Sequence, residues 1–128
     1  MTDAPDRSQR IAELEHALAN GFPSQSTLVV HADDASGRLT IQVSWVRVPA
    51  DERARQWRCV VDLSFAPDVL ARYASLGTAD RLRVRTHVCD LARRAVDEEK
   101  PRVEDAEIEC RVAVDVTRAE LDDALRAP

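Results

Sequence analysis

Six side chains in this sequence belong to the types that most often do chemistry: three histidines and three cysteines. His16, His31 and His87 fall on three separate predicted elements, and no HxxxH or HxH pair occurs. Cys89 follows His87 by two residues, but side chains two apart on a helix point in different directions and chelate a metal poorly. We therefore expect no metal site in this protein.

The three cysteines are predicted to be buried and reduced. Cys59, Cys89 and Cys110 are widely spaced and form no CxxC motif, and each lies in an apolar pattern, where cysteine behaves as a small hydrophobic residue. The opening MTDAPDRSQR contains no apolar segment of a secretory leader, and no run approaches the roughly 18 apolar residues of a membrane span. We expect a cytoplasmic protein with no membrane partner.

Motifs for nucleotide or acyl chemistry are absent from the sequence. It contains no GxSxG, no P-loop and no GxGxxG, and with three glycines a phosphate-cradling loop is difficult to build. Asp33 and Asp34 before Gly37 lack the further carboxylates of a calcium loop and predict a turn instead. We expect no cofactor and no enzymatic activity; an enzyme with an unrecognised site is the remaining alternative.

The segment RLRVRTHVCDLARRAV, residues 81–96, is the most basic run in a chain of net charge −5. An apolar stripe from Val84 to Ala95 follows helical spacing, which predicts one helix over residues 78–99 with solvated arginines on its opposite face. The alternative is a fifth strand over residues 81–88, followed by a shorter helix.

Arg85 falls within the apolar arc of that predicted helix. It either extends past the sheet edge to water or pairs with a carboxylate such as Asp62 or Glu109. Because the opposite stripe mixes charges of both signs and the chain is acidic, we expect no nucleic-acid partner. Lys100 is the only lysine, and this bias toward arginine is typical of a GC-rich bacterial genome.

The 128 residues predict a single domain, residues 1–128, with flexible segments at 1–6 and 100–106. Hydrophobic periodicity and turn signals predict the element order α-β-β-β-α-α-β-α. The expected fold class is α+β, with an antiparallel sheet of about four strands and helices packed on one face.

The two terminal helices have clear polarity patterns. The first, within PDRSQRIAELEHALANGFP, has a narrow apolar stripe and is expected to show Glu13, Glu15 and His16 to water. The last, TRAELDDAL, begins with a capping box in which Thr117 and Glu120 each bond the other's backbone amide.

Two alternating segments, RLTIQVSWV and QWRCVVDLSF, predict an antiparallel hairpin. A turn near Glu52 places Trp45 opposite Cys59 and Leu39 opposite Phe65, so both apolar rows share one face. Slipping the pairing by one residue would set an apolar row against a polar one. The register is therefore predicted along with the strands.

The end of this hairpin and the basic helix supply a candidate protein-interaction surface. Two tryptophans near the same hairpin end are large anchors that a partner or a second copy could bury, and two valines add apolar area on the other face. Arginine is enriched at protein interfaces, which adds exposed positions of the basic helix. The candidate surface comprises Trp45, Val46, Val48, Trp57, Arg83, His87 and Arg94.

The order of elements is similar to that of the small, acidic, dimeric chaperones of type III secretion. The segment LANGFP, leading into a strand, resembles the first helix-to-strand joint of that family; the family's second C-terminal strand is not evident, and no residues are carried over. We expect a non-enzymatic interaction domain that associates with itself. The alternative is a secretion-chaperone-like adaptor that holds a segment of a partner protein.

Overall fold

The computed structural model describes residues 3–22, 25–47, 57–98 and 109–126. Its elements follow the predicted order, which confirms the α+β class. In chain order they are α1 (Asp3–Gly21), β1 (Thr27–Ala32), β2 (Leu39–Arg47), β3 (Trp57–Phe65), α2 (Pro67–Ser75), α3 (Thr78–Glu98), β4 (Glu109–Val116) and α4 (Arg118–Arg126).

The predicted flexible segments lie at the limits of what the structure describes. Helix α1 begins at Asp3, so it reaches into the segment 1–6. The segment 100–106 lies outside the described residues.

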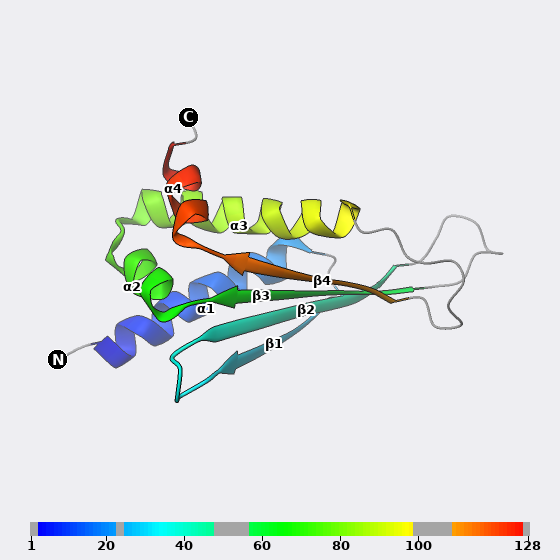
Figure 1. Cartoon of the computed structure of the whole chain (residues 1–128), viewed down its shortest axis with the longest axis horizontal. Coiled ribbons are helices and arrows are strands. Elements are labelled where there is room, and N and C mark those ends of the chain that lie inside the picture. The colour runs from blue at the N-terminus through cyan, green and yellow to red at the C-terminus, as the bar shows by residue number, and fades with distance from the viewer. Residues whose placement is uncertain (1–2, 23–24, 48–56, 99–108, 127–128) are drawn as a thin grey trace.

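The four strands form one sheet in the order β1-β2-β3-β4, with β1 and β4 at its edges (Figure 1). The first three strands are antiparallel neighbours, whereas β4 runs parallel to β3. The prediction of an antiparallel sheet is therefore wrong for the last strand, and the sheet is mixed. Between β3 and β4 the chain passes through α2 and α3, and a crossover of this length returns it to the end of the sheet where β3 began.

Strands β2 and β3 pair in the predicted register, with Trp45 opposite Cys59 and Leu39 opposite Phe65. The parallel pair then places Cys110 beside Cys59. Four of these side chains are buried, and Trp45 packs against the core while remaining partly exposed. The register thus brings apolar rows from three strands onto one face.

Helices cover that face, and no helix of the described residues lies on the other, which is called the uncovered face below (Figure 1). Helix α1 packs against β1 and β2, and α3 packs against β3 and β4. Helix α3 is continuous, which confirms the predicted helix and excludes a strand over 81–88. Its buried stripe, which includes Val84, Val88 and Ala92, completes the core between helices and sheet.

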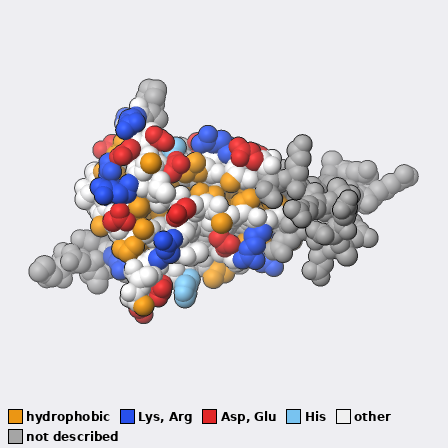
Figure 2. All heavy atoms as spheres, viewed as in Figure 1, with side chains coloured by type: hydrophobic (Ala, Val, Ile, Leu, Met, Phe, Trp, Pro, Cys, Tyr) orange, Lys and Arg blue, Asp and Glu red, His pale blue; other side chains and the backbone are white. Residues whose placement is uncertain are grey.

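The uncovered face carries charged side chains of both signs, with hydrophobic ones scattered among them (Figure 2). Arg111 Nε lies 3.2 Å from Asp62 Oδ2, and Gln42 donates to the other oxygen of Asp62 at 2.8 Å. Arg38 lies 3.8 Å from Asp115 on the same face. Neither sign dominates, as is typical of a solvated sheet face.

The turn between β1 and β2 is built on an aspartate and a glycine, as predicted. The Ala35 amide donates to Asp33 Oδ1 at 3.1 Å, and the Ser36 hydroxyl donates to Asp33 Oδ2 at 2.7 Å. These hydrogen bonds, with Ser36 first, lower the pKa of Asp33. Gly37 follows with a φ of 73°, which strains residues that have a Cβ. A Cβ there would also lie 3.1 Å from Cγ of Pro67.

We predict that Gly37→Ala lowers the free energy of unfolding by about 1–2 kcal/mol, because the positive φ and the contact with Pro67 both oppose a methyl group. Gly77→Ala is the matched control, since its added Cβ meets no atom within 4 Å. Gly77 is the N-cap of α3, where Gly is favoured over Ala, so we expect this control to lower the free energy of unfolding by no more than about 0.5 kcal/mol. Urea unfolding followed by circular dichroism measures both variants, and equal effects would contradict this account of the turn.

Candidate functional site

The predicted interaction residues of the hairpin separate in the structure. Trp45 turns toward the helices and is half-buried, with its ring centroid 4.9 Å from that of Phe22. Val46 lies on the uncovered face and is 57% exposed. Val48 and the side chain of Trp57 lie outside the described residues. The described part of this surface is one exposed valine beside a tryptophan that packs on the core.

The predicted residues of the basic helix lie in the other layer. Arg83 and Arg94 are exposed on α3, whereas His87 is half-buried. Nε2 of His87 lies 2.8 Å from Oε2 of Glu120, so His87 ties α4 to α3. The structure does not join these three residues to Val46, which lies on the uncovered face of the sheet.

Helix α4 is held by polar contacts at its start. The Glu120 amide donates to Thr117 Oγ1 at 3.3 Å, which confirms half of the predicted capping box. The Glu120 carboxylate contacts His87 instead of reaching back. Arg72 of α2 forms an ion pair with Asp122 of α4. These contacts place α4 against both α2 and α3.

Strand β1 is an edge of the sheet, and no other strand of the described residues pairs with its outer side. The sequence pattern alone does not identify this edge. Its six residues, TLVVHA, contain no charged residue and no proline. Val29, on the uncovered face, is 53% exposed, and Val30, on the helix face, is 37% exposed. Edge strands present unpaired N–H and C=O groups, which proteins usually protect with charges, prolines or bulges. The lack of charge in this run was the available signal.

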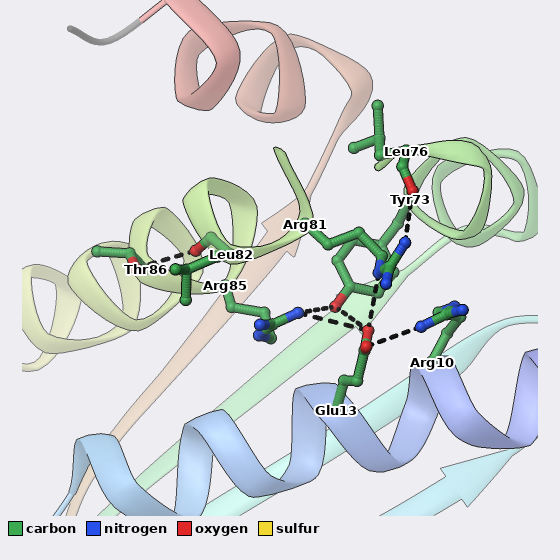
Figure 3. A network of polar contacts seen from close by, with 8 residues as sticks. All are labelled: Arg10, Glu13, Tyr73, Leu76, Arg81, Leu82, Arg85 and Thr86. Carbon is green, nitrogen blue, oxygen red and sulfur yellow. Dashed lines mark hydrogen bonds and ion pairs between the residues drawn. The ribbon is translucent and has the colours of Figure 1, made fainter. Parts of the chain in front are cut away.

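A polar network joins three helices around Glu13 (Figure 3). Tyr73 of α2 donates its hydroxyl to Oε1 of Glu13 at 2.8 Å, and Nε of Arg81 on α3 donates to the same oxygen at 3.2 Å. Arg10, one turn earlier on α1, donates to Oε2 at 2.7 Å, and Arg85 lies 3.4 Å from Oε1. One carboxylate therefore contacts three guanidinium groups and one phenol.

Two predictions concern this network, and the structure contradicts one of them. Glu13 is expected to face water, yet its side chain is only 27% exposed. Arg85 is expected to reach water or to pair with a carboxylate such as Asp62 or Glu109. It does pair with a carboxylate, but with that of Glu13 on α1, and it also donates to the Tyr73 hydroxyl at 2.9 Å. The reason is that α1 and α3 pack against one another over the sheet, so a polar position of α1 faces arginines of α3.

The network determines the charge states of Glu13 and Tyr73. Burial alone would raise the pKa of Glu13, but the hydrogen bond from Tyr73 and the charges of three arginines outweigh it and lower that pKa. Burial is the main reason that the pKa of Tyr73 is raised to about 12. Glu13 is therefore an anion and Tyr73 a neutral donor at neutral pH. Three guanidinium groups against one carboxylate leave an excess of two positive charges.

The three cysteines are the next side chains that could do chemistry. Cys59, Cys89 and Cys110 are buried, and burial raises the pKa of Cys89, which disfavours a reactive thiolate. Across the described ranges, no group of three or more His, Cys, Asp and Glu side chains is placed to hold a metal ion. Within the same ranges, no helix combines the length and the apolar character needed to cross a membrane.

These features define a class: a small two-layer α+β protein whose mixed sheet is covered by helices on one face and ends in an unprotected edge strand. Within that class, the chain belongs to the family described as protein of unknown function, DUF3022, whose sequence profile matches residues 11–115. The matched region contains β1 and all of the Glu13 network except Arg10. No curated protein and no solved structure matches the chain.

We predict that Glu13→Gln lowers the free energy of unfolding at neutral pH by about 1–2 kcal/mol, because it removes the charge that three arginines share. Since folding lowers the pKa of Glu13, its contribution is present above the unfolded-state pKa, near 4.5, and is lost as the pH falls through the folded-state pKa. The gap between wild type and variant should therefore close in acid. Urea unfolding between neutral pH and about pH 3 measures this gap.

Glu15→Gln is the matched control, because Glu15 lies on the same helix but outside the network. Because Glu15 makes none of the contacts of the Glu13 network, the free energy of unfolding of this variant should differ from wild type by no more than about a few tenths of a kcal/mol. A Glu13→Gln deficit that stays constant down to about pH 3 would show that ionised Glu13 is not what stabilises the helix layer.

Proposed function

We propose that this protein is a non-enzymatic interaction domain that associates with a second copy of itself through the edge of β1. The observation that carries the proposal is an uncharged strand at the sheet edge with Val29 and Val30 both exposed. An exposed apolar edge of this kind pairs readily with another chain. Pairing would join two four-stranded sheets into one and give the edge backbone groups their hydrogen-bond partners.

A second copy fits this edge without mismatching its faces. In an antiparallel pair, residues directly opposite one another point to the same face. A twofold axis through Val30 sets Val30 beside its own copy and Leu28 opposite the partner's Ala32. It also sets Val29 opposite the partner's His31. Leu28, Val30 and Ala32 already share the helix face through their pairs on β2, so their row would continue across the interface.

The same arrangement separates the acidic ends of the two strands. Asp33 and Asp34 follow β1 directly and are exposed. Pairing about Val30 sets Asp33 opposite the partner's Thr27. A parallel pair would instead set the two Asp33 carboxylates side by side, and like charges so placed destabilise a pair. An antiparallel twofold pair is therefore the arrangement that best suits an acidic chain.

The other edge of the sheet is protected. Strand β4 carries Arg111 and Asp115, both charged and exposed on the uncovered face. Charges of this kind disfavour the addition of another strand. One open edge and one protected edge support a closed pair of chains in preference to an extended assembly.

An extended segment of a different protein is the alternative occupant of this edge. Such a segment can add to an exposed sheet edge as a further strand, which would suit an adaptor that holds a partner protein. A second copy is favoured because it brings the matching apolar row and register with it. A chain that stays monomeric alone and takes up an extended segment would support the adaptor.

We predict that the wild-type chain scatters light as a dimer, with twice its mass of 14.3 kDa. Val29→Lys should weaken the dimer by about tenfold or more, because a twofold interface receives the added charge twice. Size-exclusion chromatography with multi-angle light scattering over a concentration series measures both proteins.

Val46→Lys is the matched control, because it makes the same change on the same face at a valine of similar exposure, 57% against 53%. Strand β2 lies inside the sheet, so this variant should remain dimeric. A dimer that survives Val29→Lys and is lost in Val46→Lys would move the interface to the hairpin surface. A wild-type monomer at high concentration would overturn self-association.

A further inference from the structure

Helices α1 and α2 and the turn between β1 and β2 border a cleft of about 530 Å³. Its wall is mainly apolar and includes Ile11, Leu70, Ala71 and Ala74. Ligand pockets in proteins have volumes of roughly 300–1,000 Å³ and apolar linings with a few polar groups. The cleft therefore has the size and lining of a small-molecule site, with the short alanine side chains leaving the space.

Two arginines give this cleft its charge. Arg7 and Arg10 of α1 line it, and no acidic side chain lines it among the described residues. The hydrogen bond from Arg7 to the carbonyl of Gly37 is long, at 3.5 Å, and Arg7 is exposed. Arg10 shares Glu13 with two further arginines, and its Nε is buried without a hydrogen-bond partner in the described part of the chain (Figure 3). The cleft thus has cationic groups that its surroundings do not fully neutralise.

We propose that the cleft binds a small organic acid, with its carboxylate held by Arg7 and Arg10 and an unbranched apolar chain against the alanines of α2. Guanidinium groups bind carboxylates through parallel, charge-assisted hydrogen bonds. The apolar chain would gain free energy by leaving water for the wall of α2. The volume of the cleft suits a small free acid better than a long peptide, which needs an extended groove.

This proposal is independent of self-association. The strand β1, which carries the proposed dimer edge, does not line the cleft. A failure to dimerise therefore leaves acid binding intact, and a failure to bind acid leaves the dimer intact.

Octanoate is the probe, and octanol is the neutral molecule with the same chain. We expect octanoate to cause saturable shifts of amide resonances in α1 and α2 of the full-length chain, and octanol to bind about tenfold more weakly because it lacks the charge. Arg7→Gln should weaken octanoate binding by about tenfold and leave octanol unaffected. Arg83→Gln, an exposed arginine of α3 outside the cleft, should bind octanoate as wild type does.

Ala71→Leu tests the cleft itself, because it fills space without removing a polar group. It should abolish the binding of both molecules, whereas Ala119→Leu, at an exposed alanine of α4, should bind normally. No saturable binding of octanoate, equal binding of octanoate and octanol, or binding unchanged by Ala71→Leu would each overturn the proposal. A peptide with a free C-terminal carboxylate that binds where octanoate does not would assign the cleft to a protein partner.

Discussion

Helix packing covers only one face of the sheet, and this one-sided burial governs what each strand exposes. Leu39, Ile41 and Val43 of β2 are fully buried because both helices and neighbouring strands surround them. Strand β1 lies at the margin of the cover, so Leu28 is half-buried while Val30, on the same face, is exposed. The apolar row therefore runs beyond the helix layer before the sheet ends. An edge formed in this way is apolar without being buried, which is the condition that favours association with another chain.

The helix layer has its own constraint, a polar contact among three helices at Glu13. Helix α1 supplies the carboxylate, α2 supplies the phenol of Tyr73, and α3 supplies Arg81 and Arg85. Charged hydrogen bonds in a half-buried setting are strengthened because water competes less for the groups, while the remaining exposure keeps the cost of desolvation moderate. The same network leaves Arg10 with only a share of one carboxylate. The packing of the helices and the positive charge of the neighbouring cleft thus have a common origin.

Local pattern predicts the elements and the hairpin register because a period of two assigns each strand residue to a face. The same alternation does not predict the direction of a strand, because Val112 and Val114 face the helices whether β4 runs parallel or antiparallel to β3. The crossover through α2 and α3 determines that the two strands are parallel. The environment of Glu13 depends on Tyr73 and Arg81, which are 60 and 68 residues away in the chain. Helical periodicity carries no information about contacts at such separations. Likewise, an uncharged strand indicates an edge only once its neighbours are known.

The basic helix α3 illustrates the difference between charge in a sequence and charge on a surface. Arg81 and Arg85 turn into the Glu13 network, and Arg93 pairs with an aspartate one turn away. Arg83 and Arg94 are the exposed members without an ion pair among the described residues. A surface that binds a polyanion by releasing counterions needs many cations along one face. The number of arginines in α3 is larger than the number that its surface presents without an ion pair in the described part of the chain. The planar guanidinium can bond several acceptors at once, which suits it to joining helices across a half-buried seam. Three of the five arginines of this helix, Arg81, Arg85 and Arg93, are therefore engaged in contacts within the helix layer.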